Sequence, residues 1–348
     1  MTQPLQTAII GYGKSGKNIH TPLIDACDEI VLRSVVRRSG PEHVEGRSGI
    51  EVIRDYRDIL RKPEIDLVVI TAPNHLHYNM ARDALRAGKH VVVDKPFTVT
   101  SDEAYELIAM AHDLRLVLTV FQNRRWDGDF LTIQKLISEN AVGRIVEFES
   151  SFNRFRNELR PGAWKEKALP GSGILYDLAP HLIDQALQLF GKPEKLFADI
   201  RNERRGETDD WFEIIFYYDG FRAVLRAGML VPEPTPRFVL HGEKGSYVKF
   251  GTDPQEEGLA AGMDPGRPDW GREEVSANGV LWRQEESGKI RQTRVETVRG
   301  NYLHFYQNVA DAILKGTPIS VKPEEAAVVI RIIELAKESH QKGMVIEL

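Results

Sequence analysis

The chain has 348 residues, of which 42% are hydrophobic and 28% charged, and its length and composition are those of a soluble globular protein with roughly two domains. Its net charge of -5 argues against a general nucleic-acid binder, and no apolar run reaches the ~18 residues of a membrane span. A single cysteine, Cys27, excludes an intrachain disulfide, and the first residues lack the pattern of a signal peptide, so we expect a cytoplasmic protein.

The first motif is a glycine-rich loop that directly follows a short apolar strand at residues 7–10. It reads Gly11-Tyr12-Gly13-Lys14-Ser15-Gly16. In a G-x-G-x-x-G loop, the first glycine permits the tight turn, the second lets the backbone approach a pyrophosphate, and the third allows the next helix to pack on the strand. The N-terminus of that helix then faces the phosphates. We therefore expect residues 11–16 to bind a dinucleotide.

The second strand, residues 30–36, ends in Arg37-Arg38-Ser39. An NAD site usually carries an acidic residue about here, where it binds the ribose 2′-hydroxyl. This chain has two guanidinium groups instead, which can bind a 2′-phosphate. The sequence therefore favours NADP over NAD, with Arg37, Arg38 and Ser39 as the contacts. A basic turn in solvent is the alternative, and it would leave the preference open.

The following residues continue to alternate between strands and helices. Strands are expected at 65–70, 90–93 and 116–120, with helices at 54–60, 77–88 and 101–113, which predicts an α/β Rossmann domain with a doubly wound parallel sheet. Thr71, Pro73 and Asn74 leave their strand at the same edge as the glycine loop, so we expect them and His77 to contact the cofactor. His75 and His77 have metal-ligand spacing without an acidic or cysteine partner nearby, so we predict no metal site.

Asp94-Lys95-Pro96 follows the apolar strand at residues 90–93. Proline stops the strand and keeps the backbone of Lys95 extended. The carboxyl ends of parallel strands are where α/β sheets bind their ligands. Lys95 is therefore a candidate catalytic residue, and Asp94 and Lys95 are candidate cofactor contacts. An ordinary surface lysine at a strand end is the alternative.

The pattern changes after residue 122, so we place a dinucleotide-binding domain at 1–122 and a second domain at 123–348. The second domain is predicted to be α+β, with a large, mostly antiparallel open sheet. Residues 251–278 are rich in glycine, proline and acidic residues and are expected to form a surface excursion. Helices are expected at 127–140, 175–190, 302–315 and 323–341, and strands at 143–155, 196–200, 211–218, 221–230, 237–240 and 246–250, with two more within 279–298.

Asp177 and His181 are four residues apart in the helix expected at 175–190, so both side chains lie on one face of it. A carboxylate beside an imidazole suits proton transfer. The spacing alone is weak evidence, because a buried histidine with satisfied hydrogen bonds is the simpler interpretation of a lone pair of this kind. Asp177 and His181 are nevertheless our candidates for catalysis and substrate binding.

Three motifs together resemble one family. The glycine loop, Asp94-Lys95-Pro96 and Asp177-Leu178-Ala179-Pro180-His181 occur in the order and spacing of the Gfo/Idh/MocA oxidoreductases, whose Glu-Lys-Pro is Asp-Lys-Pro here. The similarity extends over the whole chain. Residues 123–127, residues 173–177, and Asn301-Tyr302 with Tyr306 look most like the NADP-dependent scyllo-inositol dehydrogenases of that family.

The resemblance implies a site in a cleft between the two domains, with NADP(H) as cofactor and a polyol as substrate. His181 would take the hydroxyl proton, Lys95 would stabilise the oxygen, and Asp177 would bind a neighbouring hydroxyl. For Arg154 the alternative is a solvated charge on a strand face, and for Trp164 it is a place in the core. The expected substrate contacts are Asn123, Arg124, Arg154, Trp164, Tyr176, Asp177 and His181.

Other functions remain open at this point. A redox-assisted glycoside hydrolase would keep a tightly bound NAD, which the basic turn at 37–39 argues against. A non-catalytic dinucleotide-binding sensor would be expected to lose Lys95 or His181, and this chain has both. The partner is expected to be a small polyol, with no nucleic acid and no membrane, and with a homodimer or homotetramer formed through the second-domain sheet.

Overall fold

The computed structural model describes residues 3–348. The chain folds into two compact units, which we call unit 1 and unit 2. From the sequence, everything after residue 122 was expected in the second domain, whereas two later segments belong to unit 1. Unit 1 comprises residues up to Asn123, Gln255–Trp270 and Asn301–Ile330, and unit 2 comprises Arg124–Pro254, Gly271–Gly300 and Arg331–Leu348.

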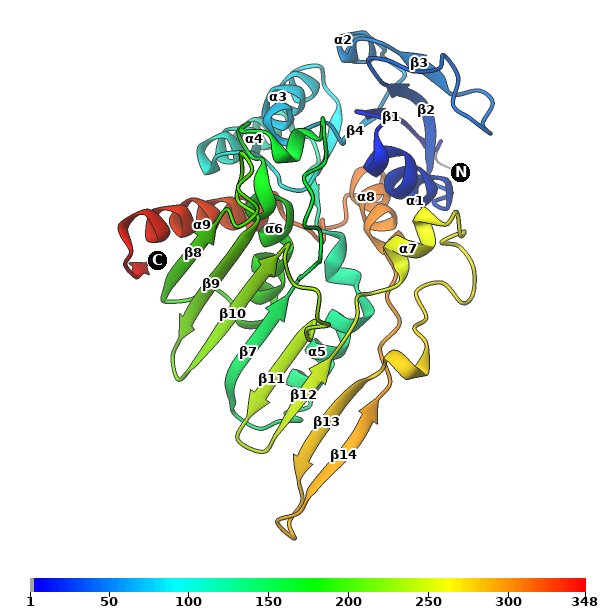
Figure 1. Cartoon of the computed structure of the whole chain (residues 1–348). Helices are drawn as coiled ribbons and strands as arrows, with labels where there is room; N and C mark the ends of the chain where they lie inside the picture. The colour runs from blue at the N-terminus through cyan, green and yellow to red at the C-terminus, as the bar shows by residue number, and fades with distance from the viewer. Residues whose placement is uncertain (1–2) are drawn as a thin grey trace. The chain divides into compact units, whose positions relative to one another are not determined.

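Unit 1 is built on a six-stranded sheet with the strand order β3-β2-β1-β4-β5-β6 (Figure 1). Every neighbouring pair is parallel, which confirms the predicted doubly wound sheet. β4 and β5 are interior strands and their apolar side chains are fully buried, as expected for strands covered on both faces. The strands are β1 (Leu5–Ile10), β2 (Ile30–Val36), β3 (Glu51–Ile53), β4 (Leu67–Ile70), β5 (His90–Asp94) and β6 (Leu118–Phe121).

Among the helices of unit 1, α4 begins with a capping box. Thr100 and Glu103 form a capping box at the start of α4, which packs against α3. A π-helical turn at Gly16–His20 precedes α1. The helices are α1 (Thr21–Asp25), α2 (Tyr56–Leu60), α3 (His77–Arg86), α4 (Ser101–Leu114), α7 (Gln255–Ala260) and α8 (Leu303–Lys315), with a 3-10 turn at Asn74–Leu76.

The segment expected as a surface excursion, residues 251–278, is mostly exposed, but part of it, Gln255–Trp270, belongs to unit 1 and contributes buried side chains there. Leu259 and Trp270 are buried within unit 1. The side-chain oxygen of Gln255 accepts hydrogen bonds from the indole N–H of Trp270 (3.0 Å) and from the backbone N–H of Tyr302 (2.7 Å). These buried groups anchor an otherwise exposed segment to unit 1, which its polar composition alone did not predict.

Unit 2 contains a nine-stranded sheet with the order β14-β13-β12-β11-β7-β10-β9-β8-β15. β7 and β10 pair in parallel and all other neighbours are antiparallel, so the predicted mostly antiparallel sheet is confirmed. The strands are β7 (Ile145–Ser151), β8 (Lys195–Arg201), β9 (Trp211–Tyr218), β10 (Phe221–Gly228), β11 (Phe238–Gly242), β12 (Gly245–Lys249), β13 (Gly279–Gln284), β14 (Ile290–Val295) and β15 (Ile346–Glu347).

One face of this sheet is covered by helices. Figure 1 shows α5 (Gly128–Ser138) and α6 (Gly173–Phe190) on the same face, and α6 packs against β9 and β10. Phe212, Ile214 and Phe216 alternate along β9 and are fully buried, as strand periodicity requires of the covered face. Asp177 and His181 therefore belong to a helix whose inner side is fixed by the sheet.

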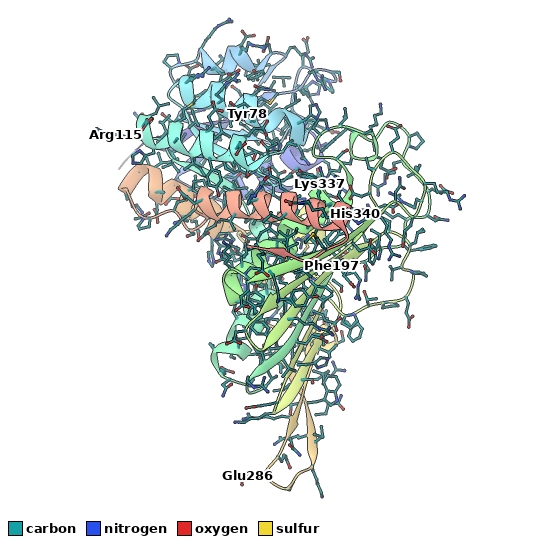
Figure 2. The ribbon with its side chains drawn as sticks, turned by 90° about the vertical axis from the view of Figure 1, so that its left-hand side faces the viewer. Tyr78, Arg115, Phe197, Glu286, Lys337 and His340 are labelled. Atoms are coloured by element: carbon teal, nitrogen blue, oxygen red, sulfur yellow. The ribbon has the colours of Figure 1, made fainter. Side chains whose placement is uncertain are left out.

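The long C-terminal helix α9 (Pro323–Lys342) passes from unit 1 to unit 2 at Ile330. Its last turns lie beside β8, where the backbone N–H of Ile200 donates to His340 Nδ1 (3.2 Å); Figure 2 labels His340 near Phe197 of β8. The hairpin of β13 and β14 ends at Glu286, also labelled there. Among residues 3–348, no helix is both long enough and apolar enough to cross a membrane.

Candidate active site

The glycine loop of unit 1 lies against the end of β4. Gly11 has a φ of +95°, and a Cβ atom there would lie 2.6 Å from the backbone nitrogen of Ala72, so only glycine fits. The hydroxyl of Thr71 donates to the carbonyl oxygen of Gly11 (2.6 Å). Thr71 therefore supports the loop. β1 and β4 are neighbours in the sheet, and their carboxyl ends form the switch point where such sheets bind dinucleotides.

The rest of the loop fits a pyrophosphate. A Cβ atom on Gly13 would meet only the carbonyl oxygen of Gly11, at 3.9 Å, so the backbone at Gly13 is open to a ligand. Tyr12 is half-buried and Lys14 is exposed beside it. Gly16 begins the helical turn that follows, and a Cβ there would crowd the Thr71 hydroxyl at 2.9 Å. Open backbone before a helical turn is the arrangement that phosphate binding needs.

In the basic turn after β2, one arginine binds the backbone of its own loop and the other faces solvent. Arg37 donates from Nη2 to the carbonyl oxygens of Pro41 and His43 (2.5 Å to His43), so its guanidinium holds its own loop. Arg38 and Ser39 are exposed. The two arginines looked alike in the sequence, whereas the structure leaves Arg38 and Ser39 as the groups that face solvent.

The side chain of His77 was expected to contact the cofactor, but it is engaged with the backbone of unit 1. Its side chain is buried, with Nδ1 2.8 Å from the carbonyl oxygen of Pro96 and Nε2 2.8 Å from that of Ala72. Burial lowers the pKa of His77. Both ring nitrogens are engaged with backbone, so His77 joins the loop after β4 to the loop after β5. Asn74 is buried at the start of the intervening 3-10 turn, which follows Pro73.

Asp94 connects the glycine loop to Lys95. Its carboxylate accepts from the Ser15 hydroxyl (2.6 Å) and from the backbone N–H of Lys95 (2.8 Å). Burial alone would raise the pKa of Asp94, but the interactions with His20 and Ser15 outweigh it and hold the pKa well below its usual range. The carboxylate is therefore ionised at all physiological pH values. Asp94 acts through its contacts with the protein, beside the loop expected to bind the cofactor.

In unit 2, the N-terminus of α6 is held by Asp209. The backbone N–H of Ile174 donates to the Asp209 carbonyl (3.0 Å) and that of Leu175 to its carboxylate (2.6 Å). Gly173 has a φ of +87°, and a Cβ there would lie 2.2 Å from the same carboxylate. Burial raises the pKa of Asp209 to about 6. Asp209 was not among the residues expected from the sequence, because no local pattern links position 209 to position 175.

The raised pKa of Asp209 predicts a pH-dependent stability. Because its folded-state pKa of about 6 exceeds the ordinary value of 3.8, ionisation is costly in the folded state and stability falls as the pH rises from about 4 through 6. The difference corresponds to at most ~3 kcal/mol. Asp209→Asn should therefore show a melting temperature that rises relative to the unmodified protein between pH 4.5 and 7.5.

Differential scanning fluorimetry across that pH range checks the expectation. Asp219→Asn, at the exposed turn between β9 and β10, is the matched control and should follow the unmodified protein at every pH. A constant offset between the Asp209→Asn variant and the unmodified protein at all pH values would contradict it.

Tyr176 and Asp177 lie near the start of α6. Asp177 accepts from the ammonium group of Lys165 (2.6 Å), which lies 5.7 Å from the ring centre of Trp164. Tyr176 is buried, with the Lys337 ammonium 5.8 Å from its ring centre; Figure 2 labels Lys337 on α9. Trp164 and Asp177, both expected from the sequence to bind substrate, are thus joined through Lys165, which no sequence motif singled out.

His181 is 4% exposed and packs near Phe152, with ring centres 6.5 Å apart. Two guanidinium groups lie over the ring of Phe152, that of Arg237 at 4.0 Å and that of Arg124 at 4.6 Å. Arg124 also donates to Asp127 (3.0 Å) in a buried ion pair. Arg124 was expected to bind substrate; the structure places it among these structural contacts, where burial of the pair makes its replacement costly.

A buried polar network fixes α6 one turn beyond His181. Arg125 binds Asp184 through two hydrogen bonds (2.8 and 2.6 Å). The next residue, Gln185, donates to the Arg124 carbonyl (3.0 Å) and accepts from Arg237 (2.6 Å). Such bidentate pairs restrict rotation as well as translation. No sequence signal pointed to Arg237, which directly precedes β11, far along the chain.

The remaining candidates occupy separate places. Asn123 is the last residue of the first segment of unit 1; it is buried, and its amide lies 3.5 Å from Glu256. Arg154 is half-buried, and its backbone N–H donates to the Gly228 carbonyl (2.8 Å) where pairing with β10 continues irregularly. Regular pairing of the strand expected at 143–155 therefore ends at Ser151. Arg154 lies in the irregular extension of that strand.

Comparison with protein families divides the chain near residue 122, where the sequence pattern changes. Residues 5–122 match the family description "Oxidoreductase family, NAD-binding Rossmann fold", and residues 134–348 match its "C-terminal alpha/beta domain". The chain belongs to the Gfo/Idh/MocA oxidoreductase family. Its first domain is therefore a Rossmann domain of the type that binds a nicotinamide dinucleotide, and the oxidoreductase fold extends over the whole chain.

Relatives of this Gfo/Idh/MocA protein are similar along their full length. It is 42% identical over 341 residues to the uncharacterised oxidoreductase YdgJ of Escherichia coli, covering 97% of each chain. It is 39% identical over 345 residues to the scyllo-inositol 2-dehydrogenase (NADP(+)) IolW of Bacillus subtilis, covering 99% of this chain and 96% of that one. Among solved structures, the putative oxidoreductase yvaA of Bacillus subtilis has a TM-score of 0.95 at 38% identity, covering 100% and 99%.

Proposed function

We propose that this oxidoreductase interconverts a secondary alcohol of a polyol and its ketone with NADP(H), most specifically scyllo-inositol and scyllo-inosose. The observation that carries the proposal is the full-length similarity to an enzyme named for that reaction. It is supported by the dinucleotide loop of unit 1 and by the presence of Lys95, Asp177 and His181 in the chain.

The preference for NADP rests on the turn after β2. No carboxylate follows this strand in Arg37-Arg38-Ser39, and the exposed Arg38 is a positive group suited to a 2′-phosphate. Arg37 contributes by shaping the turn, since its guanidinium is bound to backbone carbonyls of the same loop.

The proposed mechanism assigns a role to each of three side chains. The bound nicotinamide supplies the site that accepts or returns a hydride. Lys95, at the carboxyl end of β5, donates a hydrogen bond to the reacting oxygen and stabilises its negative charge. His181 takes the hydroxyl proton on a ring nitrogen. Asp177, held by Lys165, binds a neighbouring hydroxyl and orients the substrate.

The direct test follows NADPH absorbance with a panel of inositols, inositol ketones and aldoses, and repeats each assay with NADH. We expect turnover with scyllo-inosose and NADPH, and with scyllo-inositol and NADP in the reverse direction. No turnover with any polyol would reject the substrate class. A clear preference for NADH would reject the assignment of the turn at 37–39.

Replacing Arg38 by alanine should weaken the binding of NADPH but not that of NADH. Loss of one charge-assisted contact to a phosphate should raise the KM for NADPH by about 10- to 100-fold, with a change of about twofold at most for NADH. The ratio of kcat/KM for the two cofactors measures the effect. Arg33→Ala is the matched control, because Arg33 is exposed on the same strand but binds Gln6; an equal loss with both cofactors in Arg38→Ala would contradict the assignment.

We also propose that unit 2 mediates self-association through the face of its sheet opposite α6. This face carries half-exposed apolar residues such as Ile215 and Tyr217, together with the ion pairs Arg226–Glu213 and Arg222–Glu147. Apolar groups mixed with paired charges are typical of interfaces between subunits. Light scattering coupled to gel filtration should give the mass of a dimer or tetramer; a monomer at micromolar concentration would reject this proposal.

A further inference from the structure

Behind Lys95, three polar side chains form a chain through the interior of unit 1. The His20 Nδ1 atom lies 2.5 Å from the Tyr306 hydroxyl, and its Nε2 atom lies 3.7 Å from the Asp94 carboxylate. His20 and Tyr306 are completely buried. Asp94 is the residue before Lys95 and accepts from the Lys95 backbone N–H. The three groups come from the turn before α1, from α8 and from β5.

The protonation of this chain follows from burial. Burial raises the pKa of Tyr306 far above its ordinary value, so its hydroxyl keeps its proton. If the hydroxyl donates to Nδ1, the proton of a neutral His20 is on Nε2, which faces the Asp94 carboxylate; a protonated ring would also carry an N–H there. In either case, His20 presents a donor to the carboxylate that accepts from Ser15 and Lys95.

Aromatic packing keeps His20 in one orientation. The ring of Phe121, at the end of β6, lies 4.3 Å from the His20 ring. Phe305 packs edge-on against Phe121 at 4.9 Å, and both phenylalanines are buried. Closely packed rings of this kind restrict rotation of the imidazole.

The residue after Lys95 is also held by a buried histidine. His77 binds the Pro96 carbonyl on one side and the Ala72 carbonyl on the other, at 2.8 Å each. Buried imidazoles therefore flank Lys95 on both sides: that of His20 faces Asp94 at 3.7 Å, and that of His77 is within hydrogen-bond distance of Pro96. An ordinary surface lysine at a strand end would not need two such supports.

We propose that His20 and Tyr306 are positioning residues that hold Asp94 and so align Lys95 with the reacting oxygen. This inference rests on the proposed role of Lys95. The same carboxylate also accepts a hydrogen bond from Ser15 of the dinucleotide loop, which remains available in the variants of His20 and Tyr306. Neither His20 nor Tyr306 is placed in contact with substrate, and they act through Asp94.

Paired substitutions separate positioning from simple stability. His20→Leu removes the donor to Asp94, whereas His20→Gln keeps an N–H near the position of Nε2. Tyr306→Phe removes only the hydroxyl. Thr119→Val is the matched control, because it also removes a fully buried hydroxyl of unit 1, bound to the Val321 carbonyl at 2.7 Å.

The kinetic readout is the separation of kcat from cofactor binding. We expect kcat to fall by about 10- to 100-fold in His20→Leu and by about 3- to 10-fold in Tyr306→Phe, because a displaced catalytic group loses rate steeply with distance. His20→Gln should recover most of the loss, and Thr119→Val should retain the original kcat. The Kd for NADPH, measured by fluorescence, should stay within about threefold throughout.

A readout without substrate keeps this inference distinct from the proposed function. In protein carrying 13C-dimethylated lysines, the Lys95 resonance is identified by its loss in Lys95→Arg. It should shift in His20→Leu and Tyr306→Phe, return towards its original position in His20→Gln, and stay unchanged in Thr119→Val. An unchanged Lys95 resonance in His20→Leu overturns the inference. Absence of polyol turnover alone rejects only the proposed function, and if His20→Leu does not fold, Tyr306→Phe decides.

Discussion

Replacement of Lys95 by methionine is expected to lower kcat by about two to three orders of magnitude while NADPH still binds. Methionine retains much of the length and apolar stem of lysine but donates no hydrogen bond, and the loss of one donor to a developing oxyanion typically costs this much. The backbone N–H of Lys95 still donates to Asp94, so the loop should keep its conformation. Steady-state kinetics and NADPH fluorescence together measure the two quantities.

Lys89→Met is the matched control for this prediction. Lys89 precedes β5, at the opposite end of the strand from Lys95, and its ammonium donates to the carbonyls of Lys62 (2.6 Å) and Ile65 (2.7 Å). Its replacement should lower the melting temperature, because those buried carbonyls lose a partner, but leave kcat unchanged for the folded enzyme. Near-original turnover in Lys95→Met would remove Lys95 from the mechanism.

Replacement of His181 by glutamine is expected to lower kcat by about 10²- to 10⁴-fold, the usual contribution of a general acid or base. Glutamine can still form hydrogen bonds of similar reach but does not accept a proton, so the loss should appear in kcat more than in the KM for the polyol. The packing against Phe152 and the neighbouring Arg125–Asp184 pair should hold α6 in place. Full kinetics in both directions measure the effect.

His340→Gln provides the comparison within unit 2. His340 lies on α9, where Nδ1 accepts from the Ile200 backbone, and it has no proposed contact with the substrate. Its replacement should leave kcat within about twofold, as is usual for a surface side chain. If His181→Gln and His340→Gln behave alike, His181 is a structural histidine of the core, the simpler interpretation of its sequence spacing.

Local sequence patterns were sufficient for the architecture of both units. The alternation of apolar strands with helices predicted the parallel sheet, because strands buried on both faces must be almost continuously apolar, as β4 and β5 are. The strands expected at 211–218 and 221–230 are the antiparallel neighbours β9 and β10. Residues 255–270 escaped this reasoning, since their place depends on a few buried contacts such as that of Gln255 with Trp270 and not on periodicity.

For the candidate site, local sequence patterns predicted which residues end the strands of unit 1 and which share a face of α6. Gly11, Lys95 and His181 were identifiable because turn geometry, strand ends and helical spacing are local properties of the chain. The similarity to the Gfo/Idh/MocA oxidoreductases added the family and the expected chemistry.

The groups that support those residues are visible only in the folded chain. Arg37 and His77 are turned towards backbone carbonyls, Asp209 holds the N-terminus of α6, and His20 with Tyr306 lies behind Asp94. Each of these contacts joins polar groups whose partner is fixed by how elements pack. The cost of burying an unpaired polar group makes such partners necessary, but no local pattern in the sequence says which residue provides them.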